Sequence, residues 1–125
     1  MQVLQIKPVE TIKVDQDRLG ELYAELGEAS AEDVVCRAME ELALRLSHCE
    51  ALFRDGSWAT LRKNTRSLIA IADQVGMYAL SQVARDVTKC IDCGDTVAVA
   101  ATLARLLRIG ERSLMAVWDI GDFTE

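Results

Sequence analysis

The chain contains a single proline, Pro8, and this feature most constrains its fold. Proline removes a backbone donor and clashes with the preceding helical turn, so its absence leaves residues 15–118 open to long helices. Alanine, leucine, glutamate and arginine dominate this stretch, and all four are strong helix formers. Alternating strand patterns are absent beyond the first fourteen residues. We therefore predict an all-α protein.

Length and charge narrow the class further. The 125 residues suit one domain, and we expect an extended arm over residues 1–14 followed by one helical domain over residues 15–125. Acids outnumber bases 20 to 14, a net charge of −6 that disfavours nucleic acid as a partner. No apolar run approaches the roughly 18 residues of a membrane span, and the N-terminus lacks the pattern of a signal peptide. We expect a cytoplasmic protein with no membrane partner.

The first two helices are predicted from capping residues. Asp15 or Asp17 is expected to cap a short first helix, and Gly27 to end it, because glycine tolerates the left-handed conformation that closes many helices. Ser30 is expected to cap the second helix, with Asp33 three residues later as an acidic form of the capping box. The sequence therefore predicts a break between the two helices over residues 27–30.

Apolar residues recur every three to four positions along four longer segments, which predicts amphipathic helices with one buried face each. Turn residues separate them at 55–57, 76–77 and 94–95. The predicted segments cover residues 30–54, 58–75, 78–93 and 96–118. Because such short turns favour antiparallel neighbours, we expect an up-down-up-down antiparallel four-helix bundle with the short extra N-terminal helix as a lid. Gly110 falls on a buried face, where it permits close helix approach.

The four cysteines do not predict a metal or redox site. Cys90 and Cys93 have the CxxC spacing, but the strand–helix context of a redox motif is missing. Cys36 and Cys49 lie on another predicted helix, thirteen residues apart, which does not complete a zinc site. We interpret all four as small helix residues, with Cys49 facing the core, and expect no metal and no cofactor.

His48 is the single histidine and falls with Arg37, Glu41 and Arg45 on the wet face of the second predicted helix. A solvated surface residue is the plainest interpretation, while a phosphoacceptor or a pH-sensitive contact stays open. No metalloprotease, phosphate-loop or serine-hydrolase motif occurs. We therefore expect no catalytic residues and no enzyme activity.

The segment from Arg66 to Gly76 resembles the signature helix of histidine-containing phosphotransfer (HPt) domains, which reads roughly H-x-L-K-G-x-A-x-x-L-G. Leu68, Ala72, Val75 and Gly76 occupy the matching apolar and glycine positions. The helices and the two Gly-Asp-type turns that flank this segment occur in the same order as in the family. The resemblance covers most of the helical part, and it implies an HPt-like bundle that serves bacterial two-component phosphorelay signalling.

Three signature positions depart from the family pattern. Arg66 replaces the phosphoacceptor histidine, Ile69 the lysine and Ala70 the first glycine. A guanidinium is always protonated and has no lone pair with which to accept a phosphoryl group. The resemblance therefore implies a phosphotransfer-incompetent module that binds a response-regulator receiver domain or a histidine kinase.

The expected partner-binding residues lie on the exposed part of the signature helix. They combine an apolar centre with basic and acidic flanks, and comprise Arg62, Arg66, Ile69, Ala70 and Asp73. In this hypothesis Arg66 reaches toward the acidic pocket or the phosphoaspartate of a receiver. The alternative is that Arg62 and Arg66 only solvate a helix face.

Two further hypotheses remain. An atypical phosphotransfer protein would use His48, eighteen residues before Arg66 and outside the signature. A structural or oligomerisation bundle would use apolar residues left on wet faces, and Leu44 and Met115 are such residues. This last hypothesis implies a weak homodimer.

Overall fold

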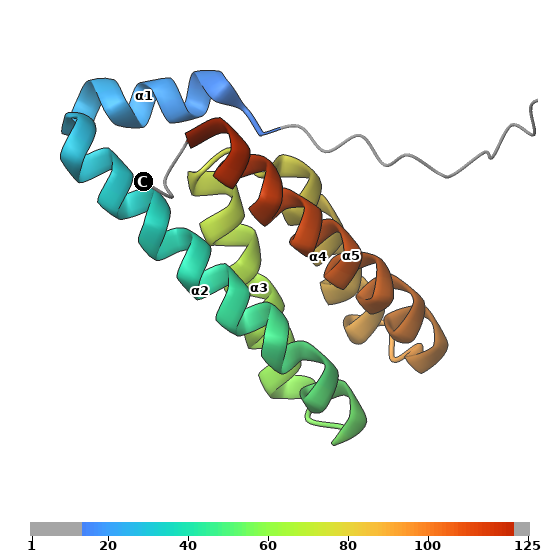
Figure 1. The fold of residues 1–125 in the computed structure, drawn as a ribbon. Coiled ribbons are helices and arrows are strands. Elements are labelled where there is room, and N and C mark those ends of the chain that lie inside the picture. The colour runs from blue at the N-terminus through green and yellow to red at the C-terminus, as the bar shows by residue number, and fades with distance from the viewer. Residues whose placement is uncertain (1–13, 122–125) are drawn as a thin grey trace, which may run out of the picture.

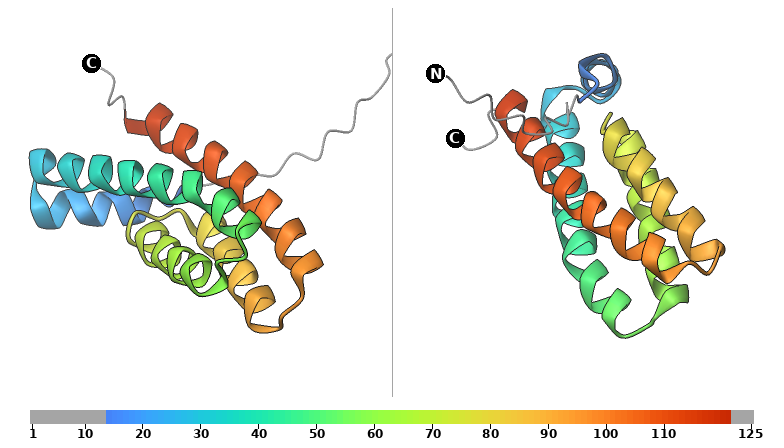
Figure 2. Two further views of the ribbon diagram at one scale, coloured as in Figure 1. Left: turned by 90° about the horizontal axis from the view of Figure 1, so that it is seen from below. Right: turned by 90° about the vertical axis from the view of Figure 1, so that its right-hand side faces the viewer.

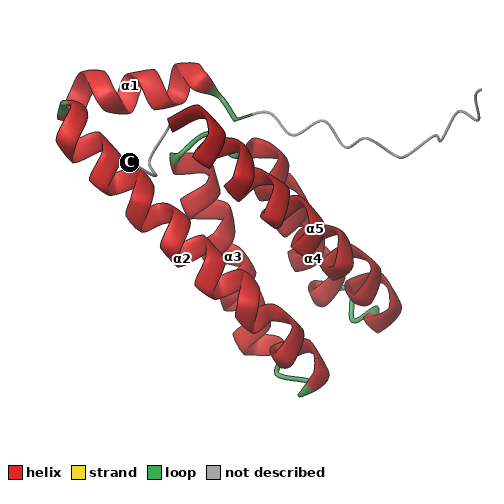
Figure 3. Ribbon diagram, in the orientation of Figure 1, coloured by secondary structure: helices red, strands yellow, loops and turns green. Residues whose placement is uncertain are grey.

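The computed structural model describes residues 14–121, with side chains described for residues 14–117, and this part is all-helical (Figures 1 and 3). The all-α prediction is confirmed. No helix in the described ranges is long and apolar enough to cross a membrane. Residues 1–13 of the predicted arm lie outside the described residues, while Val14 is buried. The elements are α1 (Gln16–Leu26), α2 (Glu28–Arg54), α3 (Trp58–Gln74), α4 (Tyr78–Asp92) and α5 (Thr96–Gly121).

The helices pack as neighbours around one core. α3 lies between α2 and α4, and α5 packs against both α4 and α2, whereas α1 contacts only α2 extensively (Figure 2). Turns of three residues, 55–57, 75–77 and 93–95, join the four longer helices. α3 therefore has one flank facing α2 and the other facing α4.

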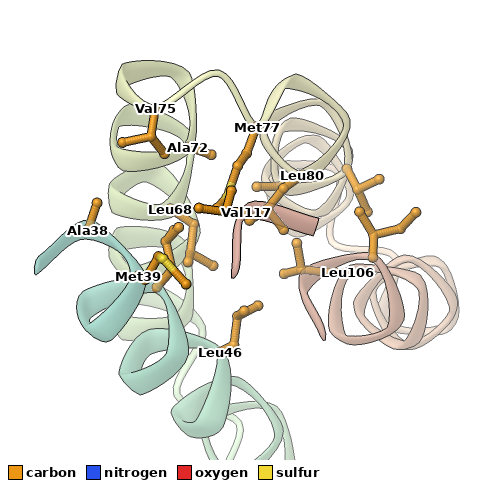
Figure 4. Packing of buried hydrophobic residues seen from close by; sticks show 14 of the residues in the cluster. Ala38, Met39, Leu46, Leu68, Ala72, Val75, Met77, Leu80, Leu106 and Val117 are labelled. Atoms are coloured by element: carbon orange, nitrogen blue, oxygen red, sulfur yellow. The ribbon is translucent and has the colours of Figure 1, made fainter. Parts of the chain in front are cut away.

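Each long helix contributes its apolar stripe to the core. Figure 4 shows Met39 and Leu46 of α2, Leu68 of α3, Leu80 of α4 and Leu106 of α5 gathered between the helices. Leu68, Leu80 and Leu106 are completely buried. Apolar area removed from water is the main stabilising term in such a domain, so the 3.6-residue periodicity determines which face of each helix turns inward.

The start of α1 is held against the turn between α3 and α4. The Asp15 carboxylate caps α1 by accepting from the amides of Asp17 at 2.9 Å and Arg18 at 3.2 Å, so the predicted Asp15 cap is confirmed. The Asp15 amide donates to the Gly76 carbonyl at 2.9 Å, and Arg18 Nε donates to the Gln74 carbonyl at 3.0 Å. A Cβ on Gly76, whose φ is +78°, would lie 2.9 Å from the Asp15 carbonyl oxygen. Glycine is therefore required at this turn.

The predicted Ser30 cap is wrong. α2 begins at Glu28, so Ser30 lies inside its first turn and is exposed. Gly27 ends α1 and also starts α2, because its carbonyl accepts from the Ala31 amide at 2.9 Å. Its φ of +80° turns the chain within one residue, which leaves no room for a separate cap.

The helices α2 and α5 approach closely at Gly110 and leave a groove between them nearby. A Cβ on Gly110 would lie 2.6 Å from Leu46 Cδ1, so the predicted close approach at Gly110 is confirmed. Leu107 and Leu114, which the helical periodicity predicts to be on the buried face of α5, are only half-buried. They line a groove of about 300 Å³ between the two helices together with Leu46.

Candidate functional site

The five residues predicted to bind a partner lie along α3, beside α4. Arg66 and Ala70 are exposed, whereas Arg62, Ile69 and Asp73 are half-buried. Arg62 and Asp73 mark the two ends of this row, about 16 Å apart along the helix axis at 1.5 Å per residue. We call these five residues the α3 patch.

At one end of the α3 patch, Arg62 pairs with Asp92 of α4. Arg62 Nε lies 2.6 Å from Asp92 Oδ1, and the second guanidinium nitrogen lies 3.2 Å from Oδ2. This two-point hydrogen bonding lowers the pKa of Asp92 and raises that of Arg62, and the charge of Arg66 lowers the Asp92 pKa further. The positive charge of Arg62 is therefore neutralised by Asp92 within the protein.

At the other end, Asp73 pairs with Arg85 of α4, with 2.9 Å between the guanidinium and Asp73 Oδ2. The same guanidinium donates to the Ser81 hydroxyl at 3.2 Å. Asp73 thus faces α4 in an ion pair, rather than standing as an unmatched acidic flank of the α3 patch.

A hydroxyl pair joins the two helices between these ion pairs. The hydroxyl oxygens of Thr65 and Thr88 lie 2.9 Å apart, and each also lies within 3.0 Å of a carbonyl one turn earlier on its own helix. Thr65 is completely buried. Polar groups therefore join α3 and α4 at three points along their contact.

Arg66 is the one charge of the α3 patch that this contact does not neutralise. It is exposed and makes no hydrogen bond or ion pair with another described residue. Ile69, in contrast, packs its side chain against the buried cluster. The surface that the α3 patch offers to a partner is therefore centred on Arg66 and Ala70.

On its other flank, α3 forms a groove of about 390 Å³ with α2, which the sequence did not predict. His48 is exposed there, as expected, but Lys63 of α3 lines the same groove. Arg45 lies beside them, with Nε 2.7 Å from Glu41 Oε1 and a terminal nitrogen 3.3 Å from Asn64 Oδ1. The sequence signal for this groove is Asn64, a polar residue three positions after Leu61 and four before Leu68, on the apolar face of α3. Its side chain is only 6% exposed.

Cys49 is buried beneath this groove. Its thiol donates to the Arg45 carbonyl at 3.3 Å and accepts from Asn64 Nδ2 at 3.2 Å. Burial raises the pKa of the Cys49 thiol to about 11, so the nucleophilic thiolate is not formed near neutral pH. Cys90 is half-buried and Cys93 exposed at the end of α4. Among the described residues, no three histidine, cysteine or acidic side chains gather in a way that would hold a metal ion.

Comparisons of the chain with protein-family models, with curated proteins and with solved structures gave no match.

Proposed function

We propose that this chain is an HPt-like module of bacterial two-component signalling that binds a response-regulator receiver domain without passing phosphate. The observation that carries the proposal is Arg66. It occupies the phosphoacceptor position of the resemblance, it is exposed, and the other charges of the α3 patch are paired with α4.

The fold of an HPt-like module, an up-down-up-down four-helix bundle, is part of this proposal. The apolar positions that carry the resemblance, Leu68, Ala72 and Val75, are all completely buried. Gly76 follows them with a positive φ, at the end of the helix. Turns of three residues favour antiparallel packing of each helix on the next. These features support an HPt-like arrangement of α2 to α5, with α1 added at one end.

Charge favours an acidic partner surface. Arg62 and Asp73 are paired with Asp92 and Arg85 of α4, so Arg66 is the unpaired charge of the α3 patch in a protein whose net charge is −6. A guanidinium forms paired hydrogen bonds with a carboxylate or a phosphoryl group, both of which the phosphorylation pocket of a receiver presents. Because arginine cannot accept the phosphoryl group, the chain would bind the receiver without phosphoryl transfer.

Calorimetric titration against a panel of bacterial receiver domains tests the proposal. Each receiver is used bare and with beryllofluoride, and histidine-kinase fragments form a second panel. We expect micromolar binding to a receiver, weakened at least about tenfold by Arg66→Glu. Arg112→Glu makes the same charge change at an exposed position on α5 and should leave binding unchanged.

Absence of binding to every receiver would contradict the proposal. Equal affinity of the Arg66→Glu and Arg112→Glu variants would contradict the assignment of the surface. Binding to a kinase fragment alone, lost in Arg66→Glu, would retain the surface and replace the partner.

A second candidate function is self-association through α2 and α5. Leu44 is 52% exposed and Met115 is 60% exposed, on the two helices that form the groove lined by leucines, Glu50 and Glu111. Exposed apolar side chains on two neighbouring helices suit a self-complementary contact. Sedimentation equilibrium over a range of concentrations would then give a mass that rises toward the dimer, and Leu44→Gln with Met115→Gln would return it to the monomer.

A further inference from the structure

The groove between α2 and α3 lies on the flank of α3 that faces away from α4, and it shares no residue with the α3 patch. Its volume of about 390 Å³ falls within the range of small-molecule sites in proteins. Its lining residues are Arg45, His48, Ala51 and Leu52 of α2, with Thr60, Lys63 and Asn64 of α3.

Every polar side chain that lines this groove carries a hydrogen-bond donor. A guanidinium, an imidazole, an ammonium group, an amide and a hydroxyl surround the hollow, and no carboxylate is among the lining residues. Glu41, which is not among the lining residues, pairs with the Arg45 guanidinium, so Lys63 is the unpaired positive charge of the groove. Such a lining favours an anion.

Neighbouring groups hold Arg45 in place. Asn64 is buried, donates from Nδ2 to the Arg45 carbonyl at 2.7 Å, and accepts from the Arg45 guanidinium at 3.3 Å. Arg45 Nε lies 2.7 Å from Glu41 Oε1, although its N–H is not aligned for a hydrogen bond. An arginine held from two sides loses less conformational freedom when it binds a ligand.

Lys63 and His48 are the donors from charged or ionisable side chains that remain for a ligand. Across the described residues, neither side chain has a hydrogen bond or an ion pair with another residue. Lys63 comes from α3 and His48 from α2, so the two donors approach the hollow from its opposite walls.

We propose that this groove binds a phosphomonoester, a doubly charged phosphate group on a small organic body. A tetrahedral dianion accepts hydrogen bonds in several directions and suits donors that converge from two helices better than a planar, singly charged carboxylate does. The groove is larger than a phosphate group, and Ala51 with Leu52 offers an apolar wall to the organic part. This site is independent of receiver binding, because it uses other residues and the other flank of α3.

The single histidine makes the test direct. Proton NMR of the full chain, prepared without a histidine tag, follows the ring signals of His48 at constant pH during titration with butyl phosphate, inorganic phosphate and butyrate. We expect butyl phosphate to shift the His48 signals to saturation with a dissociation constant of about 1 mM or lower. Inorganic phosphate should bind more weakly, and butyrate should give no saturable shift over the same concentrations.

Two lysine variants locate the site. Lys63→Met should weaken butyl phosphate binding at least about fivefold, because it removes a charge that contacts the phosphate. Lys89→Met removes an exposed lysine of α4, outside the groove, and should leave the affinity unchanged. Both positions are exposed, so both variants should keep the circular dichroism of the parent chain.

Three results would overturn the proposal: no saturable shift with butyl phosphate, equal binding of butyrate, or equal affinity of the two lysine variants.

Discussion

The two flanks of α3 meet their neighbouring helices in different ways. Toward α4, oppositely charged side chains pair at both ends of the contact and a hydroxyl pair lies between them. Toward α2, one buried amide, Asn64, organises the contact, and a groove with unmatched donors opens beside it. The same helix therefore has one closed flank and one open flank.

This difference determines which charged groups and hydrogen-bond donors on each flank remain unpaired and available to a partner. On the α4 flank, Arg62 and Asp73 are neutralised within the molecule, so Arg66 is the remaining charge of the α3 patch. On the α2 flank, Lys63 and His48 point to a hollow with no carboxylate among its lining residues. The ion pairs between α3 and α4 thus leave Arg66 for a protein partner, whereas the contact between α2 and α3 leaves a groove large enough for a small ligand.

Leu68→Ala should have the largest effect, because it damages both flanks together. Leu68 is completely buried in the core beneath them. Loss of a buried leucine side chain leaves a cavity, and we expect the free energy of unfolding to fall by about 3 kcal/mol in urea denaturation. Leu44→Ala, at an exposed position, is the matched control and should change it by less than about 0.5 kcal/mol. Equal losses of unfolding free energy in the two variants would contradict the burial of Leu68 in the core.

Asn64→Ala should destabilise the contact between α2 and α3 and leave the contact between α3 and α4 intact. It leaves the Arg45 carbonyl and the Cys49 thiol without the donor that reaches them at 2.7 Å and 3.2 Å. The Arg45 carbonyl keeps the hydrogen bond from the Cys49 thiol. The cost is therefore that of the two lost amide hydrogen bonds, about 1 to 3 kcal/mol in total, which urea denaturation measures. The α4 flank should keep its contacts, so receiver binding by the folded variant should be unchanged. A loss of receiver affinity would show that the two flanks are coupled.

The hydroxyl pair of the α4 flank should give a smaller and non-additive effect. Thr65→Val or Thr88→Val alone disrupts a pair 2.9 Å apart, and each should cost about 1 kcal/mol. In the double variant both partners are replaced by groups of the same shape, so the loss should be less than the sum of the two. A double-mutant cycle with additive losses would contradict a direct interaction between the hydroxyls.

The smallest effect should come from the exposed end of the α4 flank. Hydrogen bonding to Arg62 lowers the pKa of Asp92 in the folded state below its ordinary value of 3.8. The parent chain should therefore gain stability over Asp92→Asn above that pH, and lose the gain as the pH falls through the lowered pKa. Thermal unfolding of both chains over about pH 2 to 6 measures the difference, which about 1 M salt should reduce. An advantage that persists below the lowered pKa would contradict this origin.

Local features of the sequence were sufficient for most helix ends and for most of the buried face of each helix, with the start of α2 as an exception. Gly27, Gly56, Gly76 and Gly94, which the sequence places at helix ends or in the turns between helices, all adopt positive φ. The buried position of Cys49 follows from the same periodicity. These properties depend on residues within one or two turns, so a single sequence is enough to predict them.

The contacts between helices could not be predicted in this way. Arg62 and Asp92 are thirty residues apart, and their pairing depends on how α3 and α4 are rotated about their axes. His48 and Lys63 line the same α2–α3 groove for the same reason, although the sequence predicts only that His48 lies on the solvent-exposed face of its own helix. Side-chain partners between helices follow from packing, which local periodicity does not determine.

The most direct test of the difference between the flanks is an amide NMR map of the labelled chain titrated with the beryllofluoride form of a receiver that binds it. If Arg66 is the centre of the contact, the largest shifts should fall on residues 62–73 of α3 and on the facing part of α4. The groove residues His48 and Lys63 should shift little. Shifts centred on the α2–α3 groove, or on α2 and α5 around Leu44 and Met115, would contradict the assignment of the α3 patch as the partner surface.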